Sequence, residues 1–231
     1  MGAVCTVPAP VTQAVDMPLV LYHFPVSSPC RAVIMTAKHL GIELSLKEIN
    51  LFNKEQLKPE FLKINPQHSV PTLDDNGFIL WESRAIMGYL VNKYAPGNSL
   101  YPEDPQKRAE VDKMLYFDIG NLYKKVLDFV FPQIFTGAKP DEEKRKILRD
   151  STAILDEILS KSQYIAADHI TLADLSIIAG IGFAEVMDID FSEFEHIKNW
   201  KEKLEKELPY YKEVNEKALE DFKDYLKSRK Q

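Results

Sequence analysis

The sequence predicts a small α/β domain with a mixed sheet, followed by an all-helical domain. Up to about residue 96, strand-like and helical patterns follow one another in the order β-α-β-α-β-β-α. After a proline-bearing linker at residues 97–105, helical periodicity continues with almost no strand signal. We therefore expect a first domain at residues 17–96 and a helical domain at residues 106–231.

The first strand and the helix after it meet at a pair of serines. An apolar run at residues 18–24 predicts the strand. Pro29 suits the first helical position, where no backbone N–H is needed, and Ser28 is then expected at the N-cap. Ser27 would lie just outside the helix, its hydroxyl beside the positive end of the helix dipole, where an anion such as a thiolate is favoured. Alternatively, both serines are ordinary turn and cap residues.

Cap and turn signals predict the rest of the first domain. Asp75-Asn76-Gly77 between two apolar runs is a strong hairpin signal. The expected elements are a helix ending before Gly41, a strand at 44–49, an irregular helical connection at 54–64, strands at 69–73 and 78–81, and a helix at 82–94.

The second domain is expected to be built around one buried helix. Thr171 and Asp174 resemble a capping box and precede an apolar run at residues 175–183 with hardly a polar break. The predicted helices are at about 106–136, 141–161, 171–186, 193–206 and 211–228.

Composition excludes several classes of function. A net charge of −6 without a basic stripe argues against a nucleic-acid partner. Cys5 and Cys30 have no metal-ligand spacing, so we expect no metal, and no apolar run is long enough for a membrane span. A reduced, cytoplasmic setting is the default. Residues 1–16 are expected to be a disordered tail, although their start also matches a myristoylation pattern.

Four segments together resemble one enzyme family. They are residues 27–31 (Ser-Ser-Pro-Cys-Arg), 57–68 running into 70–73 (Val-Pro-Thr-Leu), 80–86 (Leu-Trp-Glu-Ser-Arg-Ala-Ile) and 115–118 (Leu-Tyr-Phe-Asp). Over about residues 18–228 the chain resembles the cytosolic glutathione transferases, specifically the insect delta and epsilon classes. This resemblance implies a thioredoxin-like N-terminal domain, a helical C-terminal domain, and a homodimer that conjugates glutathione to hydrophobic electrophiles.

By this resemblance the first serine, Ser27, is the catalytic residue. The expected N-cap position of Ser28 leads to the same choice, although Ser28 remains the alternative. The thiol of glutathione must ionise to attack, and its pKa is near about 8.5. A hydrogen bond to a charged group contributes about 1.5–3 kcal/mol, or about one to two pKa units. Ser27 would therefore act as a donor to the sulfur and not as a nucleophile.

The resemblance also implies a set of glutathione contacts. In the family a cis proline at Pro71 would turn the backbone of Val70 toward the cysteinyl part of the tripeptide. Ser83 would hold the glutamyl carboxylate at a helix N-terminus, and Glu82 would pair with the amino group. The remaining contacts are His68 near the glycyl end, Arg84 near the glutamyl carboxylate, and Gln56 where family members often have a histidine.

The electrophile is expected between the two domains. Ile119, Tyr123 and Val126 recur at i, i+4 and i+7 on one long helix and so share a face. Pro132 is expected to kink or end that helix. Phe131 and Phe135 flank the proline, and Phe222 with Tyr225 on the last helix could close an apolar site. An apolar helical stripe is otherwise simply core.

Two other functions fit parts of the sequence. Cys30 in the first helical turn suggests a cysteine-dependent thiol transferase or peroxidase that uses glutathione, since a thiol pKa can fall there. A non-catalytic carrier of hydrophobic ligands could have the same fold.

Overall fold

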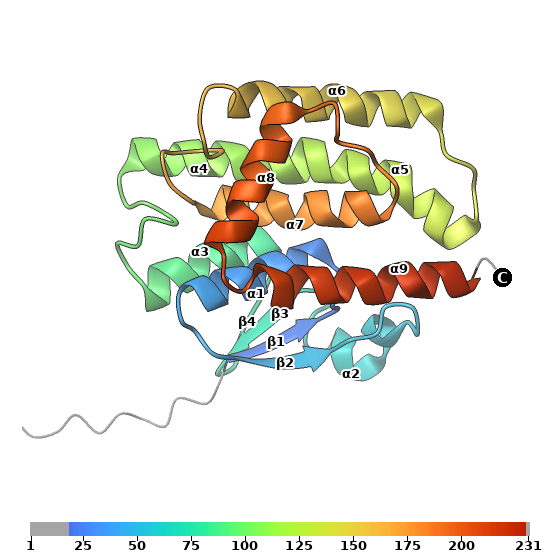
Figure 1. Cartoon of the computed structure of the whole chain (residues 1–231). Coiled ribbons are helices and arrows are strands. Elements are labelled where there is room, and N and C mark those ends of the chain that lie inside the picture. Colours follow the sequence, from blue (N-terminus) through green and yellow to red (C-terminus); the bar gives the residue numbers. More distant parts are fainter. Residues whose placement is uncertain (1–18, 230–231) are drawn as a thin grey trace, which may run out of the picture.

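The computed structural model describes residues 19–229 (Figure 1). The tail predicted at residues 1–16 lies outside the described part of the chain. The described elements form a four-stranded sheet with its own helices and a larger layer of helices above them (Figure 1).

The sheet is mixed, as predicted, with the strand order β2-β1-β3-β4. Strand β1 (Leu19–His23) runs parallel to β2 (Leu44–Glu48) and antiparallel to β3 (Thr72–Asp75). The hairpin partner of β3 is β4 (Phe78–Trp81). Alternate residues of β1 are buried, as expected for a strand with one face against the core.

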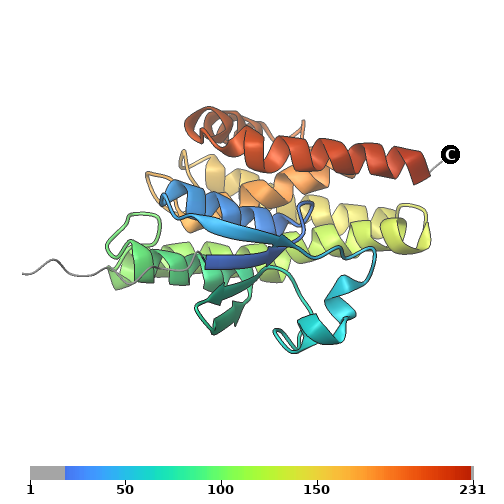
Figure 2. The same cartoon turned by 90° about the horizontal axis from the view of Figure 1, so that it is seen from below.

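Two helices separate the sheet from the helical domain. They are α1 (Ser28–His39) and α3 (Ser83–Tyr94), and both contact α7 (Leu172–Val186). In the view from below, the strands lie in front of α1, most of the helical domain lies behind it, and α9 lies beside it (Figure 2). The short helices η1 (Glu55–Leu57) and α2 (Pro59–Leu62) form the predicted irregular connection.

The long helix predicted at residues 106–136 is divided. It consists of α4 (Pro105–Phe117), a π-helical turn η2 (Asp118–Leu122) and α5 (Tyr123–Thr136). Pro132 does not end α5, which continues to Thr136. Gly137 follows with a φ of +68°, a left-handed conformation that glycine adopts without steric cost.

The remaining helices agree with the prediction apart from their bounds. They are α6 (Glu142–Leu159), α7, α8 (Glu195–Glu207) and α9 (Lys217–Arg229), the last preceded by a π-helical turn η3 (Lys212–Glu216). None of the helices at residues 19–229 has the length and apolarity to cross a membrane.

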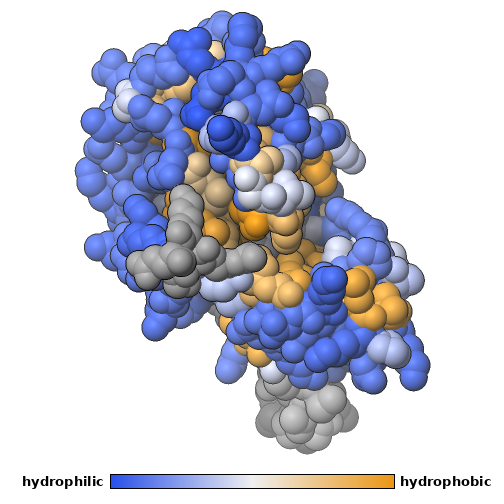
Figure 3. All heavy atoms as spheres, turned by 90° about the vertical axis from the view of Figure 1, so that its right-hand side faces the viewer, coloured by the Kyte–Doolittle hydropathy of each residue, from blue (hydrophilic) through white to orange (hydrophobic). Residues whose placement is uncertain are grey.

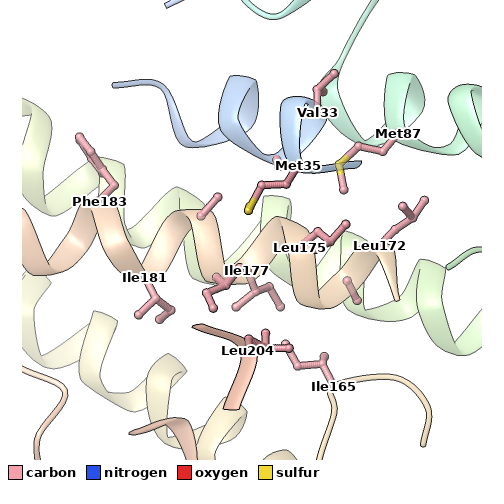
Figure 4. Close-up of a cluster of buried hydrophobic side chains, with 14 of the residues drawn as sticks. Val33, Met35, Met87, Ile165, Leu172, Leu175, Ile177, Ile181, Phe183 and Leu204 are labelled. Carbon is pink, nitrogen blue, oxygen red and sulfur yellow. The ribbon is translucent and has the colours of Figure 1, made fainter. Parts of the chain in front are cut away.

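Helix α7 is the buried centre of the helical domain, as predicted. Every residue from Leu172 to Ala184 is buried, and Thr171 forms the expected capping box with Asp174. The Asp174 Oδ1 also accepts from Trp200 Nε1 at 3.0 Å, which ties α8 to the start of α7. Figure 4 shows side chains of α7 pointing toward Met35 of α1 on one side and toward Leu204 of α8 on the other. The core is therefore continuous between the two domains.

Candidate functional site

A cavity of about 280 Å³ opens where the N-terminal end of α1 faces the helical domain. Figure 3 looks at this side of the molecule, where apolar side chains gather around a hollow between the two layers. One wall is formed by the turn after β1 and by the loops at residues 51–56 and 68–70, and the other by α5, α7 and α9. Of the predicted site residues, those that line the cavity are Ser27, Gln56, His68, Val70, Tyr123, Phe131, Phe135 and Phe222.

Ser27, and not Ser28, is the N-cap of α1. Its Oγ accepts from the backbone N–H of Cys30 at 3.4 Å. Ser28 is the first helical residue, and its Oγ accepts from Arg31 Nη2 at 3.4 Å. The predicted positions of the cap and of Pro29 are therefore wrong by one residue. Because both serines are good capping residues, the sequence alone does not distinguish them, and in the structure the hydroxyl of Ser28 contacts a guanidinium from the same helical turn instead.

The correction strengthens the case for Ser27 as a donor. One lone pair of its oxygen accepts from a backbone N–H, which leaves the O–H group as a donor that can turn toward an anion in the cavity. Both serines line the cavity, but Ser28 is almost fully buried and Ser27 is half-buried. Ser27 is thus the more accessible hydroxyl at the positive end of α1.

The peptide bond between Val70 and Pro71 is cis, as the resemblance implies. Val70 lines the cavity, whereas Pro71 is buried beneath it. Among the backbone hydrogen bonds of residues 19–229, none uses the N–H of Val70. This N–H is therefore available to a ligand at the end of β3.

Asn65 supports this loop and was not found from the sequence. It is fully buried, and its Nδ2 donates to the Ser69 carbonyl at 3.1 Å and to Thr72 Oγ1 at 2.9 Å. A buried amide with several partners fixes the backbone on both sides of Val70. An asparagine in a loop gives no sequence signal of such a role, because its partners follow from the folded loop.

The predicted contacts Glu82, Ser83 and Arg84 lie at the start of α3 and do not line the cavity. The backbone of Glu82 has a φ of +72°, which is unusual for any residue other than glycine. The Glu82 Oε1 accepts a hydrogen bond from Gln67 Nε2 at 2.9 Å. Arg84 donates to Ser83 Oγ at 3.0 Å and forms an ion pair with the buried Asp118 of η2. Asp118 in turn accepts from Ser176 Oγ at 2.6 Å. Arg84 is thus held inside the protein.

Of the predicted face of Ile119, Tyr123 and Val126, only Tyr123 lines the cavity. Val126 is in the core and Ile119 is exposed outside the cavity. Ile119 lies inside the π-helical turn Asp118–Leu122, whose wider turn changes its direction relative to Tyr123. Tyr123 and Val126 are both in α5, where Val126 packs into the core. Burial raises the pKa of Tyr123, so its phenol stays neutral.

Aromatic side chains from the sheet domain and from the helical domain meet at the cavity. The ring of Phe52 stacks against Tyr225 at 5.0 Å and Phe222 at 6.3 Å, and Phe222 stacks against Phe183 at 6.1 Å. Phe52 and Phe183 both line the cavity and were not predicted. Their place in the site follows from tertiary packing, which leaves no local pattern.

Cys30 is not a reactive thiol. Its side chain is fully buried, and burial raises the pKa of the thiol to about 11, although a hydrogen bond with Ser27 partly opposes this rise. A thiol with this pKa is protonated at neutral pH and is a poor nucleophile. The cysteine-dependent alternative therefore has no support in the site.

A larger hollow of about 1010 Å³ lies next to this cavity, between the end of α5, the end of α7 and α9. It shares Ile134 and Phe135 with the smaller cavity but contains neither serine and no predicted glutathione contact. In the described part of the chain no group of three His, Cys, Asp or Glu side chains is placed to hold a metal ion. The smaller cavity is therefore the candidate active site.

Comparison with known proteins agrees with this geometry. Residues 21–99 match the glutathione S-transferase N-terminal domain, and residues 121–207 match the C-terminal domain of the same family. Glutathione S-transferase D7 of Anopheles gambiae is 42% identical over 212 residues, which cover 91% of this chain and 97% of that protein.

Solved structures give the same result. A delta-class glutathione transferase of Nilaparvata lugens has 47% identity and a TM-score of 0.88, covering 91% of this chain and 99% of its own. An epsilon-class glutathione S-transferase of Musca domestica has 38% identity and a TM-score of 0.85, covering 91% and 97%. The sheet domain is thus thioredoxin-like, as the resemblance implied, and the chain belongs to the glutathione S-transferase family.

Proposed function

We propose that this transferase activates glutathione through Ser27 and conjugates it to hydrophobic electrophiles in a detoxication reaction. The observation that carries the proposal is the position of Ser27 as the N-cap of α1, at the edge of a cavity whose other wall is aromatic. The Ser27 hydroxyl and the positive end of the α1 dipole lie on one side of the cavity, and an aromatic surface that suits an apolar electrophile lies on the other.

The reaction uses the thiolate as nucleophile. Glutathione loses its thiol proton to solvent, and the Ser27 hydroxyl donates a hydrogen bond to the resulting sulfur anion. The sulfur attacks an electrophilic carbon, a C–S bond forms, and the leaving group departs with its electron pair. Stabilising the anion by about 1.5–3 kcal/mol lowers the thiol pKa by about one to two pKa units, so that much of the bound thiol is ionised at neutral pH.

Glutathione is proposed to bind along the loop and helix starts beside Ser27. The unpaired N–H of Val70 supports a strand-like contact with the cysteinyl backbone. Ser83 and Glu82 at the N-terminal end of α3 would hold the glutamyl group. Gln56 has a buried Oε1 without a partner at residues 19–229, which suits a contact with a bound peptide. His68, which lines the cavity, is a further proposed contact. Pro71 and Arg84 are proposed to belong to the same site by holding Val70 and Ser83 in place.

The electrophile is proposed to bind against Tyr123, Phe131, Phe135 and Phe222. Two of the residues first predicted for this role, Ile119 and Val126, do not line the cavity and are not proposed as contacts. Four aromatic rings suit flat or bulky apolar molecules.

Replacing Ser27 tests the proposal. We expect Ser27→Ala to lower kcat/KM with an activated chloronitrobenzene by about tenfold to a hundredfold, the effect of losing one hydrogen bond to a charge. Ser27→Gly should fall equally, because glycine caps a helix almost as well as serine but has no donor. Ser27→Thr keeps the hydroxyl and should retain most activity.

The alternative is a carrier of hydrophobic ligands, which the apolar cavity would also serve. Binding of a fluorescent apolar probe without measurable conjugation by the wild type would favour it. Equal, measurable rates for wild type and Ser27→Ala would instead remove Ser27 from the mechanism.

Three further statements remain predictions. We expect the first domain at residues 17–96, the linker at 97–105 and the helical domain at 106–231. We also expect a homodimer and a cytoplasmic location, which family membership supports.

A further inference from the structure

Arg31 is a buried cation in the first turn of α1. Only 1% of its surface is exposed. Its Nη1 donates to Asn215 Oδ1 of η3 at 2.5 Å, and its Nη2 donates to the Ala179 carbonyl of α7 at 2.9 Å and to Ser28 Oγ at 3.4 Å. Its Nε has no partner at residues 19–229. All of its hydrogen-bond acceptors are neutral.

Arg31 is therefore a charge without a counter-ion. None of the ion pairs at residues 19–229 includes it. The titratable groups that act on it are Tyr211, Tyr123 and Cys30, which are uncharged at neutral pH. Glu185 and Glu205 line the hollow on the other side of Tyr211, but both pair with Lys201.

This arrangement is unfavourable in the empty protein for two reasons. Removing a charge from water costs several kcal/mol when no opposite charge is nearby. A cation near a helix N-terminus also opposes the helix dipole. Burial lowers the pKa of Arg31 to about 10, so the guanidinium is still charged at neutral pH. An anion at the same end of the helix is attracted both by the guanidinium and by the helix dipole, and this attraction offsets both costs.

The place for that anion is the cavity wall at Ser27 and Ser28. The Ser28 hydroxyl, which accepts from Arg31, lines the cavity next to Ser27. The Ser28 side chain therefore lies between the Arg31 guanidinium and the part of the cavity in which the glutathione sulfur is proposed to bind.

We propose that Arg31 is a positioning residue whose fixed positive charge, acting through Ser28 and added to the dipole of α1, stabilises the glutathione thiolate at Ser27. The inference rests on the proposed function. It assigns part of the thiol activation to a residue that does not touch the substrate.

The test is the pKa of the bound thiol, measured from the ultraviolet thiolate absorbance of glutathione on the enzyme as a function of pH. Arg31→Gln removes the charge and should raise that pKa by about one pH unit, with the same upward movement of the acid limb of kcat/KM. Arg31→Lys keeps the charge and should move it less.

Asn215→Asp tests the same charge without removing Arg31. A carboxylate at this position pairs with the guanidinium, which should keep the fold and still raise the thiol pKa. This variant decides the question if Arg31→Gln does not fold.

Thr36→Val is the matched control. Thr36 is fully buried on the same helix, and its Oγ1 donates to the Ala32 carbonyl at 2.9 Å. Its loss should lower stability without moving the thiol pKa. S-Hexylglutathione, whose sulfur cannot ionise, should bind the Arg31→Gln and Asn215→Asp variants with wild-type affinity, because no negative charge forms next to Ser27 and Ser28.

The outcomes separate the two proposals. A wild-type thiolate signal whose pKa stays the same in Asn215→Asp and in Arg31→Gln overturns the role of Arg31 and leaves the Ser27 mechanism intact. Absence of a thiolate signal in the wild type overturns the Ser27 mechanism itself. A loss of S-hexylglutathione binding as large as the loss of activity would make Arg31 a structural residue only.

Discussion

Arg84 and Asp118 form a buried ion pair that joins the first turn of α3 to the π-helical turn η2. The two side chains are 14% and 2% exposed. The pair connects the domain that holds the proposed glutathione contacts to the domain that holds the apolar wall. It lies next to Tyr123, whose ring is 5.5 Å from the Arg84 guanidinium.

We expect Asp118→Asn to lower the free energy of unfolding by about 3 kcal/mol, because it leaves the Arg84 charge buried without its partner. Urea unfolding at neutral pH measures this change. The control is Asp128→Asn, which breaks an exposed pair with Lys124 and should cost less than about 1 kcal/mol. Equal losses in the two variants would mean that the buried pair contributes no more than a surface one.

Asp75 predicts a dependence of stability on pH. Burial alone would raise the pKa of its carboxyl, but hydrogen bonds from Lys93, Tyr89 and Tyr94 outweigh burial and lower it to about 2. A carboxyl whose pKa is lowered on folding stabilises the protein above its unfolded pKa of about 3.9 and loses that effect as the pH falls toward 2. We expect a contribution of about 2 kcal/mol at neutral pH.

The measurement compares wild type with Asp75→Asn. The difference in unfolding free energy should be constant between pH 6 and 7 and should shrink in the acid range, starting at about pH 4. A difference that is the same at every pH would show that the network acts through packing and not through the charge of Asp75.

Phe52 is expected to control the affinity for bulky electrophiles. Its ring stacks against Phe222 and Tyr225 of α9 and closes the cavity from the sheet domain. Phe52→Ala should raise the KM for an aromatic electrophile by about tenfold, since one aromatic contact contributes about 0.5–1.5 kcal/mol beyond its buried area. The KM for glutathione should change little.

Steady-state kinetics with each substrate varied in turn checks this expectation. Phe78→Ala is the control, because Phe78 is a half-exposed aromatic residue on β4 outside the cavity. A similar rise in both values of KM for Phe52→Ala would indicate a general disturbance of the sheet domain.

Local patterns were enough to predict the order of the elements. The Asp75-Asn76-Gly77 turn placed the hairpin, and the apolar run after Thr171 identified the central helix, because both signals lie within a few neighbouring residues. The family of the chain was also predicted from four short segments. The comparisons confirm it.

The errors came from interactions between residues that are distant or compete with one another. Ser27 and Ser28 are both good caps, and in the folded protein Ser27 caps α1 while the hydroxyl of Ser28 contacts the Arg31 guanidinium. Ile119 does not reach the cavity because it lies in a π-helical turn, which no sequence pattern indicated, and Val126 does not reach it because it packs into the core. Phe52 reaches the cavity through contacts with a helix more than 150 residues away along the sequence.

The stacking of Phe52 on α9 has a consequence for how such a protein can diversify. The proposed thiol-activating residue, Ser27, belongs to the turn after β1. The aromatic ring of Phe222, which lines the other side of the cavity, belongs to α9. Substitutions near the C-terminus can therefore change the range of accepted molecules while the sulfur chemistry, encoded some 190 residues earlier, stays as it is.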